Sequence, residues 1–329
     1  MKTSEELKQY YEKNILPELQ ILDDHRIKIK KKLNPLIAIG VVVTVISLWL
    51  IGHFSLSIYF MIIPISICAV LLMGWYFSFY REFLSNYKKQ VIQKIVVFVD
   101  PGLSYDKDKY VPKSFFLESQ IFQARADSYG GDDFVFGKIG ETDIQFSELN
   151  VKHIEKTGPP KTGSQSNRKR ETRTYPVFKG LFFVADFNKN FTHKTIVLPD
   201  KAEKLFGRMG QKLQSMNITR GELIKLEDPE FEKMFVVYGD DQIESRYVLS
   251  TSLMKRIVDF QNKTNKEIYF SFVASKLFVA ISYEKTLFEP SIFSSLIVFS
   301  KIEEYFEDLQ IAINIVEDLN LNTRIWNKA

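Results

Sequence analysis

Two uncharged, strongly apolar runs near the N-terminus constrain this chain more than any other feature. Residues 36–51 read LIAIGVVVTVISLWLI and residues 54–79 read FSLSIYFMIIPISICAVLLMGWYFSF. A helix that crosses a hydrocarbon core about 30 Å thick needs about 20 residues, so the first run is slightly short by itself and the second can tilt. Only Gly52 and His53 separate the runs. The pattern predicts a tight transmembrane helical hairpin, with a buried hairpin of a soluble protein as the alternative.

Basic residues flank the two runs on their outer sides only. The connection between the runs has no Lys or Arg, and positive charge marks the cytoplasmic side of a membrane helix. A cleaved signal peptide fits poorly, because 35 mostly polar residues precede the first run. We therefore expect a multi-pass inner-membrane protein with both termini in the cytoplasm. The flanking basic residues are Arg26, Lys28, Lys30, Lys31 and Lys32 before the first run, and Arg81, Lys88, Lys89 and Lys94 after the second.

The amino-acid composition limits which classes of protein the rest of the chain can belong to. The chain has 329 residues, and its 45% hydrophobic content is ample for a packed core. A net charge of +4 is too small to indicate nucleic-acid binding by itself. The single cysteine, Cys68, excludes an internal disulfide and a cysteine-based zinc cluster.

The residue pattern divides the chain into four parts. Residues 1–34 form an amphipathic segment of one or two helices, in which Pro17 breaks the helical spacing, and residues 35–80 form the hairpin. Residues 81–100 form a connecting helix, and residues 101–329 form a cytoplasmic domain. Helices and strands without regular βαβ alternation predict an α+β fold with a mainly antiparallel sheet. The expected helices are Lys113–Ala124, Lys201–Ser215 and Lys301–Leu319, and the expected strands are Asp133–Ile139, Thr142–Asn150, Val177–Phe187, Thr195–Leu198, Phe235–Tyr238, Tyr269–Val273 and Lys276–Ser282.

Residues 156–173, KTGPPKTGSQSNRKRETR, form a basic stretch that predicts a flexible loop between strands. A solvated excursion is the simplest interpretation. Loose contact with anionic membrane lipids is the next, because the domain is tethered near the inner leaflet. Nucleic acid ranks third, since no aromatic side chain is interleaved to stack on bases. The lipid-facing candidates are Arg168, Lys169, Arg170 and Arg173.

The chain contains no recognisable catalytic, metal or cofactor motif. Residues 131–138, GDDFVFGK, fail the spacing of a phosphate loop, and Ile139 stands where that motif needs Ser or Thr. The domain has only His153 and His193, with no HExxH spacing and no GxSxG nucleophile elbow. We therefore name no catalytic residue, no metal ligand and no cofactor.

A stretch rich in carboxylates, LEDPEFEKMFVVYGDDQIESRY at residues 226–247, raises the question of an acid/base site. Asp228, followed by Pro229 and Glu230, has the features of a helix N-cap. If the chain from Gln242 onward is extended, Gln242, Glu244 and Arg246 share one face of a strand. A satisfied ion pair is the simpler interpretation of that face, and a polar ligand site is the alternative.

Three features follow one another along the chain. They are an amphipathic helix before a two-span hairpin, the stretch KGLFFVADFNKNF at residues 179–191, and the stretch LEDPEFEKMFVVYGDDQIESRYVLS at residues 226–250. In this order the chain resembles the bacterial domain-of-unknown-function family numbered 3137. The resemblance implies a membrane-anchored protein with a cytoplasmic domain and no established activity. It also implies a possible partner of the LemA-like class of membrane proteins.

Two functions remain open from the sequence. The first is a non-catalytic interaction or membrane-surface module on a two-span anchor. The second is a membrane-tethered enzyme or small-ligand receptor, whose polar site is built from Asp186, Asn188, Gln242, Glu244 and Arg246. Convergence of these five side chains in a pocket would favour the second function.

Overall fold

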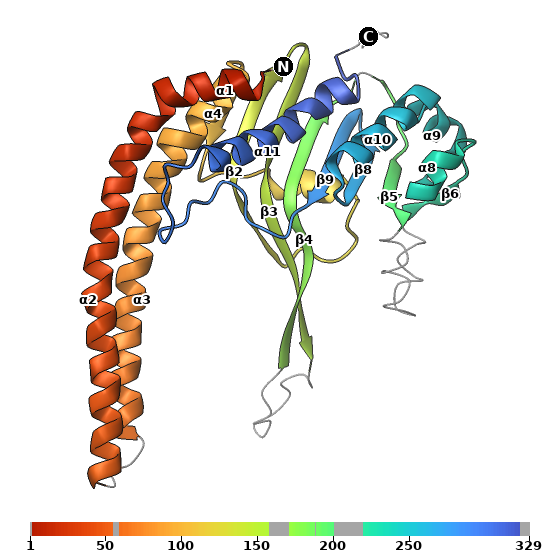
Figure 1. Cartoon of the computed structure of the whole chain (residues 1–329). Helices are drawn as coiled ribbons and strands as arrows, with labels where there is room; N and C mark the ends of the chain where they lie inside the picture. Colours follow the sequence, from red (N-terminus) through yellow and green to blue (C-terminus); the bar gives the residue numbers. More distant parts are fainter. Residues whose placement is uncertain (1, 55–58, 158–170, 188, 201–219, 323–329) are drawn as a thin grey trace. The chain divides into compact units, whose positions relative to one another are not determined.

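The structure is a computed structural model that describes residues 2–54, 59–157, 171–187, 189–200 and 220–322 (Figure 1). The chain forms two compact units. The first comprises Met1–Val99 with Phe288–Phe306, and the second comprises Asp100–Leu287 with Glu307–Ala329. Each unit has its own packed residues.

The first unit begins with one long helical path. Helix α1 (Ser4–Tyr10) leads through a π-helical turn, η1 (Tyr11–Ile15), into α2 (Leu16–Phe54). Thr3 starts it as the N-cap in a capping box with Glu6. Of the one or two helices expected here, the structure has one helical path, which Pro17 does not end. Pro17 lies in the first turn of α2, directly after η1, and a π-helical turn is one of the ways in which a helix absorbs a local irregularity.

A second helical path returns beside the first: α3 (Tyr59–Tyr87), the π-helical turn η2 (Lys88–Ile92) and α4 (Gln93–Val99). Helices α2 and α3 run side by side over most of their length (Figure 1). Gly52 and His53 still belong to α2, so these two residues do not form the turn of the hairpin. Both paths are long and apolar enough to cross a membrane, and their most apolar windows are 0% and 7% buried.

Away from the apolar runs, the first unit has an ordinary packed core. Leu7 and Ile15 of the first path and Val91 and Ile95 of the second are fully buried. The segment Phe288–Phe306 belongs to the same unit. It is held by a buried ion pair on α2, because Asp23 accepts from the Leu296 amide at 2.9 Å and Arg26 donates to the Ile292 carbonyl at 3.0 Å.

The second unit is built on one sheet in which every described pairing is antiparallel, with the order β1-β2-β3-β4-β9-β8-β5-β7-β6 (Figure 1). The expected α+β class with an antiparallel sheet is confirmed. The strands are β1 (Leu103–Asp106), β2 (Ser128–Ile139), β3 (Thr142–Thr157), β4 (Glu171–Asp186), β5 (Thr195–Pro199), β6 (Glu222–Ile224), β7 (Phe235–Gly239), β8 (Ile268–Val273) and β9 (Lys276–Ser282).

The centre of this sheet is buried on both faces, because apolar residues fill consecutive positions of β4 and β9. Phe178 and Phe182 of β4 belong to a cluster with Phe116 of α5 (Lys113–Glu118), which covers one face. Leu181 and Phe183 point to the opposite face and are also buried. Helix α10 (Thr251–Thr264) and the C-terminal part of α11 (Phe299–Asp318) lie across one face of the sheet (Figure 1).

Several element limits differ from the sequence expectation. Strand β3 continues to Thr157 and β4 begins at Glu171, so Arg173 is in β4 opposite Glu155 and not in a loop. Helix α5 ends at Glu118 instead of Ala124. Strands β1 and β6 and helices α9 (Gln242–Val248) and α10 were not predicted. The helix expected at residues 201–215 lies outside the described residues.

Candidate functional site

The polar candidate region is organised by α9, a short helix that begins where the sequence suggested a strand. Because each helical residue turns by about 100°, Gln242, Glu244 and Arg246 do not share one face, and the strand interpretation was wrong. Asp241 decides the outcome. It is the N-cap of α9, and its carboxylate accepts a hydrogen bond from the Glu244 amide at 2.6 Å.

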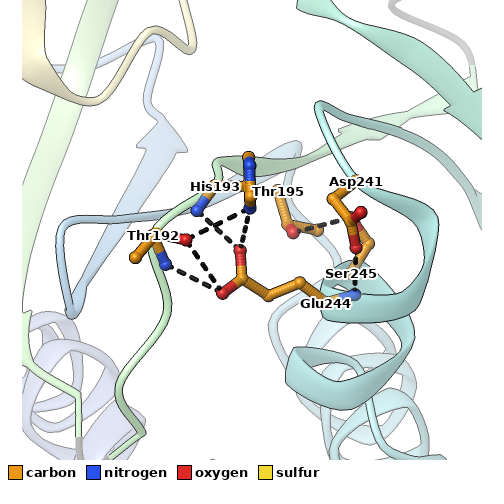
Figure 2. A network of polar contacts seen from close by, with 6 residues as sticks. All are labelled: Thr192, His193, Thr195, Asp241, Glu244 and Ser245. Carbon is orange, nitrogen blue, oxygen red and sulfur yellow. Dashed lines mark hydrogen bonds and ion pairs between the residues drawn. The ribbon is translucent and has the colours of Figure 1, made fainter.

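Glu244 is the centre of the network in Figure 2. One of its oxygens accepts from the Thr192 amide at 2.8 Å and from the Thr192 hydroxyl at 3.4 Å. The other accepts from the His193 amide at 2.6 Å and contacts His193 Nδ1 at 2.8 Å. The carboxylate therefore joins α9 to the segment that enters β5.

These contacts use the acceptor capacity of Glu244. A carboxylate has about four lone-pair sites, and four donors of the same chain point at this one. Partial burial raises the pKa of Glu244, but hydrogen bonds from the Thr192 and His193 amides outweigh burial, and the net pKa is lowered. The ionised group is thus stabilised as an acceptor, which is the opposite of what a general acid at neutral pH requires.

Further contacts hold α9 at its middle and at its C-terminus. The Thr195 hydroxyl donates to the buried Ser245 hydroxyl at 3.0 Å (Figure 2). At the C-terminus, Lys189 donates to the carbonyl of Tyr247 at 2.7 Å and to that of Val248 at 3.3 Å. A cation at the negative end of the helix dipole is favourable. Burial lowers the pKa of Lys189. Together with Glu244, these contacts join α9 to the segment that precedes β5 and to the first residue of β5.

The other predicted members of the polar site have separate surroundings. Gln242 is exposed at the start of α9. Arg246 donates to the Lys225 carbonyl at 3.3 Å, a different backbone segment from the one that Glu244 binds. Asp186 is the last residue of β4 and lies opposite Lys276 in the register. Asn188 lies outside the described residues, as do Arg168, Lys169 and Arg170 of the basic stretch.

Most carboxylates of the 226–247 stretch have structural partners. Asp228 is the N-cap of α8 (Pro229–Met234) and accepts from the amides of Glu230 and Phe231 at 3.0 and 3.1 Å. Glu232 accepts from the Leu226 amide at 2.9 Å. Asp240 lies 3.4 Å from the ammonium of Lys194. Together with Asp241 and Glu244, these residues form caps and ties between loops.

A second group of carboxylates was not found from the sequence. Asp132, Asp133 and Glu148 each place one oxygen within 4.8 Å of the others, an arrangement that could hold a metal ion. Two of them already accept from the protein: the Tyr105 hydroxyl donates to Asp133, and the Leu287 amide donates to Glu148 at 2.6 Å. Burial, reinforced by Asp133, raises the pKa of Tyr105, so this tyrosine remains a donor. Glu148 joins the group through the register of β2 and β3, which no local motif reveals.

Residues 176–321 match the family described as "Protein of unknown function (DUF3137)". The resemblance to family 3137 is therefore confirmed over this part of the chain, which runs from β4 to the end of α11 and includes the Glu244 network. The description assigns no activity to the family.

Comparison with curated proteins finds no match. Among solved structures, the chain is similar to one described as the crystal structure of the mycobacterial trehalose monomycolate transport factor A, TtfA. The identity is 9% and the TM-score 0.33, over 72% of this chain and 97% of the other.

Proposed function

We propose that this protein is a two-span inner-membrane protein whose cytoplasmic α+β domain acts as a non-catalytic interaction or membrane-surface module. The observation that carries the proposal is the apolar surface of α2 and α3. Large apolar side chains there are more than half exposed, for example Trp49 at 61%, Val70 at 70% and Leu71 at 67%. Soluble monomers rarely expose contiguous apolar surface of this kind, whereas lipid tails cover it at no cost.

Charge supports the orientation. Basic residues gather at the ends of α2 and α3 that are remote from the reversal, and Arg26 and Lys94 already have partners inside the first unit. Lys and Arg favour the cytoplasmic side, so both termini belong there. Reporter fusions after Ser4 and after Ala329 test this assignment. We expect both reporters to be active in the cytoplasm, and termini on opposite sides would contradict two spans.

The non-catalytic role is supported by the way in which the polar candidates are used. Glu244, the most heavily bonded of them, is saturated by backbone and side-chain donors, and Arg246 binds a different segment. An enzyme or small-ligand receptor built on Asp186, Asn188, Gln242, Glu244 and Arg246 would need some of these groups to point together into a pocket.

The interaction role predicts a protein partner, and the LemA-like class is the first to examine. Affinity isolation of the full chain from native membranes, followed by mass spectrometry, tests this directly. A variant with Ile243 and Tyr247 changed to Ser tests whether the partner binds at α9. These α9 residues are 82% and 43% exposed, and the Tyr247 ring also lies 4.8 Å from the Lys189 ammonium. A partner that the variant loses would place the interaction on α9, and a partner that it retains would place it elsewhere.

A further inference from the structure

An open cavity lies between helices α2 and α3 just beyond the apolar runs, on the side where the basic residues lie. Its volume is about 200 Å³, and a single water needs roughly 10–15 Å³. The lining residues include 25, 28, 29 and 32 of α2 and 79, 82, 83 and 86 of α3. The spacing i, i+3, i+4, i+7 places each set on one helix face, so the cavity forms where two such faces meet.

The cavity has an apolar floor and a polar rim. Ile29 and Phe83 are 8% and 4% exposed and form part of the floor, with Phe79 half-buried beside them. Lys28 and Lys32 are exposed at the rim. A lining that combines apolar surface with cations matches an amphiphile with a negative charge, and it fits a purely apolar or purely ionic ligand less well.

The position of the cavity along the helices matches the headgroup layer of a bilayer. Lys32 and Lys28 precede Leu36, where the first apolar run starts, by about 6 and 12 Å at the helical rise. Phe79 ends the second run. The headgroup layer is roughly 5–8 Å deep on each side, so the end of the cavity at Lys32 and Phe79 falls within it.

The charges at the rim favour an anion. Neither Lys28 nor Lys32 forms an ion pair within the part of the chain that the structure describes. Glu82 contributes one negative charge, which leaves the lining positive, and lysine is a common ligand of phosphate. Basic pockets between membrane helices on the cytoplasmic side are suited to anionic headgroups.

We propose that this cavity binds the headgroup of an anionic phospholipid, with Lys32 on the phosphate, Lys28 at the outer part of the headgroup and Phe79 against the glycerol and first acyl carbons. The proposal rests on the membrane insertion proposed above, and it names the lipid class and the binding site. It assigns a retained lipid to a defined cavity, whereas a polybasic segment alone would attract anionic lipids diffusely.

The test uses the full chain in a neutral detergent with equal amounts of phosphatidylglycerol and phosphatidylcholine, and native mass spectrometry of the retained lipid. We expect phosphatidylglycerol to be retained preferentially. Lys28→Gln with Lys32→Gln should lower its retention at least fivefold. The matched control is Lys30→Gln with Lys31→Gln, which removes the same charge from the same segment but does not line the cavity, and it should change retention less than twofold. Asn86→Trp, which fills the rim without changing charge, should also lower retention.

Several results would overturn the proposal. Equal losses in the two lysine pairs would indicate diffuse attraction, and equal retention of both lipids would remove the preference for an anion. Displacement of the lipid by millimolar inorganic phosphate would identify a soluble phosphate as the ligand. Alkaline carbonate extraction of native membranes distinguishes failure of the cavity proposal from failure of the membrane assignment. An integral protein without lipid preference would overturn the cavity alone, and an extracted protein would overturn the membrane assignment as well.

Discussion

Replacement of Glu244 by alanine tests whether this carboxylate is a structural tie. The substitution removes the acceptor of the Thr192 and His193 amides. It leaves α9 capped by Asp241 and attached through the contacts of Thr195 with Ser245 and of Lys189 with the C-terminus of the helix. We expect the segment before β5 to open more often, while the sheet itself persists. Glu244→Gln keeps one acceptor oxygen and should fall between alanine and the native residue.

The magnitude follows from the two amide bonds. Hydrogen bonds to a charged group contribute about 1.5–3 kcal/mol each, and water replaces part of this because the Glu244 side chain is 21% exposed. We therefore expect about 2–3 kcal/mol less protection of these amides. At about 1.4 kcal/mol per factor of ten, that corresponds to roughly 30- to 150-fold faster amide exchange.

Hydrogen–deuterium exchange of the full chain in detergent measures the effect locally, which avoids the assumption that a chain of two units unfolds in one step. Gln242→Ala, an exposed position on the same helix, is the control and should leave exchange within about twofold. Unchanged exchange at Thr192 and His193 in Glu244→Ala would refute the structural role. Loss of biological function in Glu244→Gln with native exchange would point instead to chemistry at this carboxylate.

Three further predictions concern local geometry and pH. Asp228→Ala should cost about 0.5–2 kcal/mol, measured as faster exchange of the α8 amides, whereas Asp228→Asn should be nearly silent because it still caps the helix. Gly180→Ala should abolish folding or lower the free energy of unfolding, measured by thermal unfolding, by more than about 3 kcal/mol, because the φ of Gly180 is +150° and a Cβ would lie 2.1 Å from a β9 carbonyl oxygen. Gly130→Ala is the control and should be tolerated, because a Cβ there meets nothing within 4 Å. Acidification should loosen the contacts of Glu244 and Asp23, because hydrogen bonds outweigh burial and lower the pKa of each carboxyl from its usual value of 4.5 or 3.8. The stability that the two carboxylates contribute is complete above these usual values and is lost as the pH falls through the lowered pKa values. A pH series of amide exchange measures this loss.

The features that could be predicted from the sequence are those that depend on neighbours along the chain. The length of the apolar runs is sufficient to predict two long helices, whatever surrounds them. The Asp-Pro-Glu order at residues 228–230 predicts a capped helix, because the cap bonds to amides two and three residues away. Consecutive apolar residues in β4 and β9 indicate central strands for the same local reason.

What only the tertiary structure decided depends on residues far apart in the chain. The spacing Gln-x-Glu-x-Arg fits a strand face as well as a helix. The residues form a helix that Asp241 caps, and Glu244 on that helix bonds to Thr192, which lies about 50 residues earlier in the chain. The group of Asp132, Asp133 and Glu148 requires the register of β2 with β3. The lipid cavity likewise requires the pairing of α2 with α3, whose lining residues are about 50 positions apart. Each helix stripe is visible in the sequence, but a cavity exists only where two stripes face each other, and packing sets that alignment.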